Sequence, residues 1–244
     1  MMKNTKLTDE QKTYVENNYG KGKTAVQIAK ELNVPLNSIY RFAQKKKLSK
    51  KLNPVFEITN FQEQIILGGI LGDGSFKKNG SNYYYRECHA IPEAEYLEWK
   101  FNALKNLTTS KLYNIPKRKE SQNDQIGFQT VNTPSLNPYV HMDIDEVIDK
   151  LDELGIIIWL LDDGWIRKNS KVHSYGVSTA DFTDEQINRI IQKLDEFGLS
   201  AHIIGTKKEL SLCSVNNARI KEIAYKFFPK DMDIIKKKIN DLHG

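Results

Sequence analysis

The stretch ILGGILGDGSF, Ile66 to Phe76, opens like a buried helix but contains three glycines before it ends at an Asp-Gly pair. Glycine in a helix interior is less favourable than alanine by about 1 kcal/mol. Glycines at this density therefore indicate that another backbone approaches the helix closely. The carboxylate of Asp73 is also unfavourable here, because the C-terminal end of a helix carries partial negative charge. Both features call for a partner elsewhere in the chain.

A matching stretch lies 90 residues further on, in IIIWLLDDGWI, Ile156 to Ile166. When Asp73 is aligned with Asp163, Tyr85 falls opposite Tyr175, and the register continues without a gap into the following amphipathic segment. A chance Asp-Gly coincidence would not align its neighbours over such a distance. The chain after residue 53 is therefore predicted to contain two copies of one unit.

Each copy is expected to have the same order of elements: a helix ending at Asp-Gly, two strands, a helix, two strands and a last helix. Alternating aromatic and β-branched residues predict the strands, and a period of 3.6 residues predicts the helices. After the Asp-Gly helices, we expect elements at residues 81–88, 93–107, 111–115 and 125–130, and at residues 171–179, 183–197, 201–206, 210–215 and 218–228. This is an α+β arrangement.

The positive charge is concentrated in residues 1–53, which hold 12 Lys and Arg against 4 Asp and Glu, whereas the remainder holds 24 against 27. This excess points to a polyanionic partner for the first segment. Three short helices are expected there, at about residues 8–19, 24–32 and 36–46. Asn33 is expected at a tight turn with positive φ, which Asn tolerates better than most residues.

This segment resembles a helix-turn-helix DNA-binding module. Val26 is among the residues expected to face its interior. DNA contacts are expected from the outward face of the last helix, through Asn37, Ser38, Arg41, Gln44 and Lys45. A bundle used for packing or for protein contact would show the same inner pattern, so the charge excess is what favours DNA. The expected domains are residues 1–53, including a basic linker, then 54–150 and 151–244.

The rest of the chain resembles the LAGLIDADG homing endonucleases in their two-motif, single-chain form. The resemblance is carried by WLLDDG (159–164), EYLEWKFNAL (95–104), IGFQTVNTPSL (126–136) and SVNNARIKEIAYKFFPKDM (214–232), and it covers about residues 61–235. It implies a pseudo-symmetric tandem αββαββα core with two saddle-shaped antiparallel sheets, beside the small all-α module. It also implies site-specific double-strand cleavage of DNA at a long target, as in intron homing.

The resemblance assigns metal binding and catalysis to Asp73 and Asp163. Side by side at two helix ends, they would form a negative pocket of hard oxygen ligands suited to Mg²⁺, with Mn²⁺ as a substitute. Gly72 and Asp162 precede them and belong to the expected metal site, although Asp162 could instead form hydrogen bonds between the helices or support a ligand. A single Asp-Gly pair would more simply be a turn, so the second copy is what favours a metal.

Gly68 and Gly72 lie four residues apart and are expected to line the seam between the two helices. Trp159 is expected to fill this seam from the second copy, which would make the seam asymmetric. Lys117 and Lys207 occupy equivalent positions and are candidates for a basic catalytic residue. Phosphate contacts are expected from Lys77, Lys78, Arg118, Arg167, Lys168 and Lys208.

A non-cleaving nucleic-acid-binding protein on the same fold, either an RNA maturase or a transcriptional regulator, is the alternative function. Retention of both Asp73 and Asp163 favours the nuclease. Double-stranded DNA is the expected partner, intron RNA is a second candidate, and a monomer is expected. No histidine or cysteine pairing suggests zinc, and His89 is expected in packing or in solvent. Without an apolar run of roughly 20 residues or a signal-peptide pattern, an intracellular, cytoplasmic protein with no membrane partner is expected.

Overall fold

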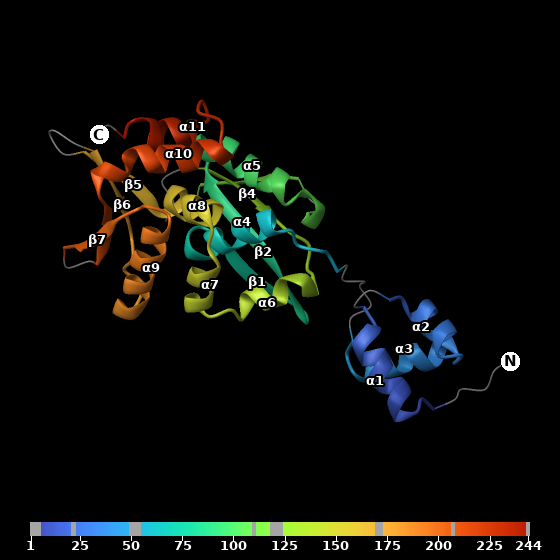
Figure 1. The fold of residues 1–244 in the computed structure, drawn as a ribbon. Helices are drawn as coiled ribbons and strands as arrows, with labels where there is room; N and C mark the ends of the chain where they lie inside the picture. The colour runs from blue at the N-terminus through green and yellow to red at the C-terminus, as the bar shows by residue number, and fades with distance from the viewer. Residues whose placement is uncertain are drawn as a thin grey trace. The chain divides into compact units, whose positions relative to one another are not determined.

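The computed structural model describes residues 6–20, 23–48, 55–108, 111–117, 124–168, 173–205 and 208–242 (Figure 1). Contacts divide the chain into two compact units, one comprising Met1–Glu57, Lys77–Tyr84 and Val131–Val140, and the other Ile58–Phe76, Tyr85–Thr130 and His141–Gly244. The first unit contains the basic N-terminal segment. The second contains both Asp-Gly helices and most of the two sheets.

Three helices form the N-terminal module: α1 (Asp9–Asn18), α2 (Ala25–Glu31) and α3 (Leu36–Lys45). Thr8 and Thr24 begin the first two with reciprocal capping boxes, which satisfy backbone donors that the helix leaves unpaired. Val15, Ile28 and Ile39 are fully buried, one from each helix. The order of elements that residues 1–53 predicted is therefore present.

The turn between α2 and α3 agrees with the prediction, because Asn33 has a φ of 50°. Val26, however, does not face the interior. Its side chain is 59% exposed, since Ala25, Ile28 and Ala29 already supply the inner face of a helix only seven residues long.

Two central helices lie side by side in the second unit: α4 (Asn60–Leu71) and α8 (Glu153–Asp163) (Figure 1). Thr59 caps α4 with a capping box, and the Asp152 carboxylate accepts hydrogen bonds from the first turn of α8. Most residues of both helices are buried. A helix that is apolar on all sides belongs in a protein core, and here each helix is enclosed by its partner and by the surrounding sheets and helices.

Each central helix leads into a four-stranded sheet. The first sheet has the order β1-β2-β4-β3, from β1 (Ser75–Asn79), β2 (Asn82–Ala90), β3 (Tyr113–Ile115) and β4 (Gln125–Gln129). The second has the order β5-β6-β8-β7, from β5 (Gly164–Lys168), β6 (His173–Val177), β7 (Ala201–Ile204) and β8 (Glu209–Leu212). The identical orders confirm the tandem α+β unit that the 90-residue repeat predicted.

The remaining helices pack on the sheets, on the central helices or on one another (Figure 1). They are η1 (Ile91–Glu93), α5 (Ala94–Ala103), η2 (Lys105–Leu107), η3 (Pro134–Leu136), α6 (Asn137–Val140), α7 (Ile144–Lys150), α9 (Asp184–Glu196), η4 (Ser214–Asn216), α10 (Asn217–Phe227), α11 (Asp233–Ile235) and the π-helix η5 (Lys236–Asn240). The amphipathic helices α5 and α9 occupy equivalent places in the two copies, as expected. Within the described part of the chain, no helix combines the length and apolarity that crossing a bilayer requires.

Strand β2 carries ionisable side chains on its inner face. Successive residues of a strand point to opposite faces, and Tyr85, Glu87 and His89 all fall on the buried face, each exposed by 3% or less. An ordinary inner face would be apolar. Two charged groups at core positions therefore mark β2 as the strand that supplies a polar site.

Candidate functional site

The seam between α4 and α8 is built on glycine. A Cβ added to Gly68 would lie 2.5 Å from the carbonyl oxygen of Gly155, and one added to Gly72 would lie 2.5 Å from the Cβ of Asp162. Real Cβ atoms do not approach so closely, so the two backbones can meet only where the side chain is absent. The contacting residues repeat at helical spacing on both helices, which gives a continuous line of close approach.

The structure corrects the expected position of Trp159. Its ring lies 6.4 Å from that of Phe182 and adjoins Ile190 and Leu194 of α9, away from α4. Ile158 faces Gly68 instead. One residue along a helix turns the side chain by about 100°, so a seam through Ile158 leaves its neighbour pointing elsewhere.

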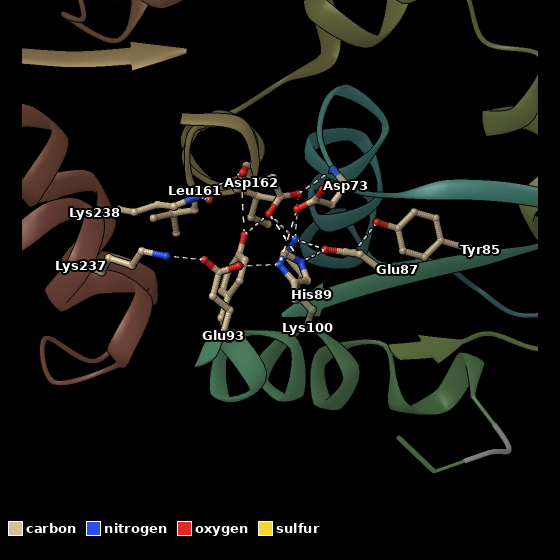
Figure 2. A network of polar contacts seen from close by, with 12 residues as sticks. Asp73, Tyr85, Glu87, His89, Glu93, Lys100, Leu161, Asp162, Lys237 and Lys238 are labelled. Atoms are coloured by element: carbon tan, nitrogen blue, oxygen red, sulfur yellow. Dashed lines mark hydrogen bonds and ion pairs between the residues drawn. The ribbon is translucent and has the colours of Figure 1, made fainter. Parts of the chain in front are cut away.

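Asp162 lies at the centre of the polar site, at the end of α8 (Figure 2). Its fully buried carboxylate accepts hydrogen bonds from Lys100 Nζ at 2.7 and 3.0 Å and from the Tyr96 hydroxyl at 2.9 Å. The backbone N–H of Asp73 donates to it at 3.4 Å. Only the bond from Asp73 joins Asp162 to the end of α4, and the stronger contacts join it to α5.

Lys100 and His89 join Asp162 to the acidic side chains of the first copy (Figure 2). Lys100, which is 0% exposed, also forms an ion pair with Glu87. His89 Nε2 lies 2.9 Å from Glu87 Oε1, and its Nδ1 lies 3.3 Å from Glu93 Oε2 and 3.5 Å from Asp73 Oδ2. Of the two expectations for His89, packing is met and solvent exposure is not, and the buried imidazole also lies among carboxylates.

Charge pairing determines the protonation of this cluster. Burial lowers the pKa of His89, but hydrogen bonds to Glu87 and Glu93 outweigh it and raise the pKa to about 9. Burial raises the pKa of Glu87, but Lys100 and His89 outweigh it and lower the pKa to about 2. The hydrogen bond with His89 similarly lowers the pKa of Glu93 to about 2. At neutral pH the imidazole is therefore a cation between two carboxylates.

Asp73 and Asp163 have the opposite electrostatic environment. Desolvation, and after it the nearby Asp162 carboxylate, raise the pKa of each to about 6. The Asp163 side chain forms no hydrogen bond or ion pair with a described residue. Asp73 approaches only the His89 imidazole, which Glu87 and Glu93 already neutralise. These two carboxylates are thus under-compensated, which means that neither has a cation of its own to balance its negative charge.

One set of possible metal ligands can be chosen by distance alone. Among the described residues, Asp73, His89 and Asp162 each offer an atom within 4.8 Å of the others, and Asp163 is outside this set. Electrostatics favour a different choice, because a cation bound by His89 would have to displace its proton and a cation bound by Asp162 would have to displace Lys100. We favour Asp73 and Asp163, whose oxygen donors and missing positive charge suit a hard divalent cation.

Lys238 approaches the same place from η5. Its ammonium donates to the carbonyl oxygens of Leu161 and Asp162, two of the unpaired groups at the end of α8 (Figure 2). Burial lowers its pKa. Lys237 beside it lies 3.2 Å from Glu93. Neither lysine was among the sequence-based candidates, because η5 lies beyond the part of the chain in which the two copies could be aligned.

Three charged members of the cluster have no charged counterpart in the second copy. At the repeat offset of 90, Glu87, His89 and Lys100 correspond to Val177, Thr179 and Ile190. Those three residues are buried at 2% exposure or less. This contrast between ionisable and uncharged residues at equivalent core positions was visible in the sequence and could have identified these three members.

The remaining basic candidates of the core are dispersed. Lys117 is exposed, and its backbone N–H donates to Asp124. Lys208 pairs with Asp184 at 2.6 Å, and Arg167 pairs with Glu209 across the second sheet. The side chains of Lys77, Lys78 and Lys168 are exposed on their strands. Arg118 and Lys207 lie outside the described residues. Lys100 and Lys238, rather than Lys117, are the lysines that contact the cluster.

The N-terminal module presents a basic hollow of about 420 Å³ beside α3. Arg41 and Lys45 line it together with Lys6 and Lys12 of the α1 side. Asn37 and Gln44 are exposed, as expected for groups that contact a ligand. Ser38 also lines this hollow and is only 8% exposed, so little of it is accessible to a ligand.

Known proteins resemble this architecture and this pair of motif helices. A model of the LAGLIDADG DNA endonuclease family matches residues 63–220. The homing endonuclease I-WcaI, solved bound to its DNA recognition sequence, is 18% identical with a TM-score of 0.61, over 80% of this chain and 90% of that one. I-DmoI, solved with nicked target DNA in the presence of manganese, is 13% identical with a TM-score of 0.41, over 75% and 100%. No curated protein matches the chain.

The likeness to I-WcaI extends through both halves of the core and confirms the expected fold class. The family model covers more than half of the chain, from the first turn of α4 to α10. Both motif helices and both sheets fall inside it. The chain belongs to the LAGLIDADG DNA endonuclease family.

Proposed function

We propose that this protein is a site-specific endonuclease that hydrolyses both strands of duplex DNA at a long target, using divalent cations held by Asp73 and Asp163. The observation that carries the proposal is the pair of under-compensated carboxylates at the ends of two helices that meet at Gly72 and Asp162. Family membership and the DNA-bound state of I-WcaI support a DNA substrate.

A divalent cation there would polarise a phosphoryl oxygen and lower the pKa of bound water. The chain's own residues would prepare the centre. Lys100 and Tyr96 hold the Asp162 carboxylate in place through hydrogen bonds, and Lys100 balances its charge, so the negative charge left for a cation is that of the two proposed ligands. Lys238 occupies the carbonyl oxygens beside Asp163, which fixes the end of α8. Mg²⁺ is the proposed metal and Mn²⁺ its substitute, since both prefer oxygen ligands.

The basic N-terminal module is proposed to contact the same duplex outside the cleaved region. Its Arg41 and Lys45 line the hollow beside α3, where phosphate or base edges can be bound. The proposed division of the chain is therefore a helical DNA-binding module of residues 1–53, followed by the two halves at 54–150 and 151–244. We propose a monomer, because both halves of the centre come from one chain.

Selection of cleaved sites from randomised duplex DNA with Mg²⁺ tests this function. We expect a specific site cut on both strands, and Asp73→Asn or Asp163→Asn should leave at most a nick. Asp195→Asn, at an exposed position of α9, is the matched control and should cut normally. Specific binding with no metal-dependent cleavage by the natural sequence would reject the nuclease and favour the non-cleaving function.

A further inference from the structure

The second sheet carries an arginine held in an unusually fixed position. Ile166 pairs with Tyr175 on the buried face, so the alternation of β5 turns Trp165 and Arg167 to the opposite face. The Arg167 guanidinium carbon lies 5.5 Å from the centre of the Trp165 ring. This stacking holds the guanidinium plane against an aromatic face.

Glu209 fixes the far end of the same side chain. Arg167 lies on β5 and Glu209 on β8, with β6 between them. Their ion pair crosses that strand at Gly176, where an added Cβ would lie 2.7 Å from Arg167 Nε and 3.0 Å from the Trp165 ring. The missing side chain at Gly176 is therefore what lets the guanidinium cross the sheet.

This packing is unfavourable for folding alone. Arg167 Nε is buried and has no hydrogen-bond partner. An unsatisfied buried donor destabilises a protein, whereas an arginine extended into solvent would avoid that loss. Nη2 donates one hydrogen bond to Glu209. The second hydrogen of Nη2 and the hydrogens of Nη1 remain, so these two nitrogens can donate side by side as a planar fork. The side chain keeps partial access to solvent, with 27% of its surface exposed.

A phosphate contact does not need these features. Phosphates are bound well by mobile cations with uncompensated charge, such as the exposed Lys168, which has no ion pair with a described residue. Arg167 differs in both respects, because Glu209 offsets its charge and three neighbours fix its orientation. A fixed planar fork suits two acceptors at a set spacing, and guanine presents such a pair, N7 and O6, in the major groove.

We propose that Arg167 reads a guanine in the part of the DNA target that lies against the second sheet, and that Trp165, Gly176 and Glu209 are the residues that position it. This inference rests on the proposed DNA function. Arg167 would then discriminate between bases, whereas its position at the end of a strand had suggested only a phosphate contact.

The test is base-preference profiling of the full-length protein. Every position of a selected target is replaced by each base pair, and binding is measured in EDTA for the natural sequence and for Arg167→Gln, Arg167→Lys, Glu209→Gln and Lys168→Gln. The natural sequence should prefer guanine at one position by about 10- to 100-fold. Arg167→Gln should remove the preference at that position alone, and Arg167→Lys, which keeps the charge but not the fork, should also lose it.

The two remaining variants separate fork geometry from charge. Glu209→Gln should weaken the same preference while increasing the salt dependence of binding, because it exposes a full positive charge. Lys168→Gln should weaken binding equally for all sequences. Uniform weakening by both Arg167 variants, with the guanine preference intact, would overturn the inference while leaving the nuclease function in place. Absence of sequence-specific binding by the natural protein would overturn both. Thermal denaturation of Arg167→Lys verifies that the profile comes from folded protein.

Discussion

The Cβ of Asp162 on α8 lies 2.5 Å from the place that a Cβ on Gly72, at the end of α4, would occupy. Asp162 therefore leaves no room for a side chain at Gly72. The two residues also occupy equivalent positions of the repeat, at an offset of 90. The centre of the site is thus a place where one copy supplies a carboxylate and the other supplies room for it.

Gly72→Ala should therefore destabilise the protein. Overpacking of this kind typically lowers the free energy of unfolding by about 1–3 kcal/mol, and the methyl group would meet a helix that Gly68 also holds close. Chemical denaturation measures the change. Gln192→Ala, at an exposed position of α9, is the control and should change stability by less than about 0.5 kcal/mol. Equal stability of the two variants would contradict the close approach at Gly72.

Lys100→Met should destabilise the protein strongly, although the two side chains are similar in size. It would leave the carboxylates of Glu87 and Asp162 without their main cation inside the protein. Removing one partner of a buried ion pair typically costs about 3–5 kcal/mol of unfolding free energy. Lys111→Met, at an exposed position, should have little effect in the same denaturation experiment. A loss no greater than that of the Lys111 variant would show that the cluster does not depend on Lys100.

Mg²⁺ or Mn²⁺ should raise the melting temperature, because a ligand that binds only the folded state stabilises it. At a metal concentration of 100 times Kd the gain is about 2.7 kcal/mol. Chelation should reverse it, and neither Asp73→Asn nor Asp163→Asn should show the full gain. Asp195→Asn should respond like the natural sequence. If His89→Gln abolishes the response while Asp163→Asn retains it, the ligands are those closest in space rather than the two under-compensated acids.

Metal-free protein should lose stability between pH 6.5 and about 9. The pKa of His89 is raised from 6.5 to about 9 by Glu87 and Glu93, so its contribution is complete below pH 6.5 and disappears as pH rises through the folded value. A pKa difference of this size between the folded and unfolded states corresponds to about 3 kcal/mol of unfolding free energy. Denaturation in EDTA across this range measures it, and His89→Gln should flatten the profile. A natural-sequence profile that is already flat would mean that the imidazole is neutral in the fold.

The N-terminal module should bind DNA mainly through charge. Arg41→Ala and Lys45→Ala each remove a cation from the hollow beside α3, and each should reduce the slope of log affinity against log salt by about 1 if it contacts a phosphate. Cleavage of bound DNA should proceed at the normal rate. Lys30→Ala, exposed on α2 and outside the hollow, is the control. Unchanged slopes for both hollow variants would argue for a packing role of the module.

The 90-residue repeat was enough to predict that the two halves share one order of helices and strands along the chain, and the two sheets have the same strand order. The repeat was not enough to predict which residues of each helix face the other one at the seam. Gly69 and Trp159 occupy equivalent positions, and both turn away from the facing helix, Gly69 toward the Tyr85 hydroxyl and Trp159 toward Phe182. Pairing residues by alignment treats equivalent positions as touching, whereas contact depends on the rotation of each helix about its axis.

The charged cluster was missed for a different reason. Glu87 and His89 are two residues apart on β2, but Lys100 comes from α5 and Asp162 from the other copy. Only the folded chain brings them together. The pairing of charge then determines which carboxylates remain for a metal, a property that no single segment of sequence contains.

The substitution of Val177, Thr179 and Ile190 for Glu87, His89 and Lys100 amounts to an internal comparison within one molecule. The second copy forms the same sheet order with buried, uncharged residues at those positions. Its architecture therefore does not require buried ions, and the first copy carries them in addition to what folding demands. Selection on the polar centre and selection on the scaffold can act separately, so the scaffold could persist in a descendant that has lost every charge of the cluster.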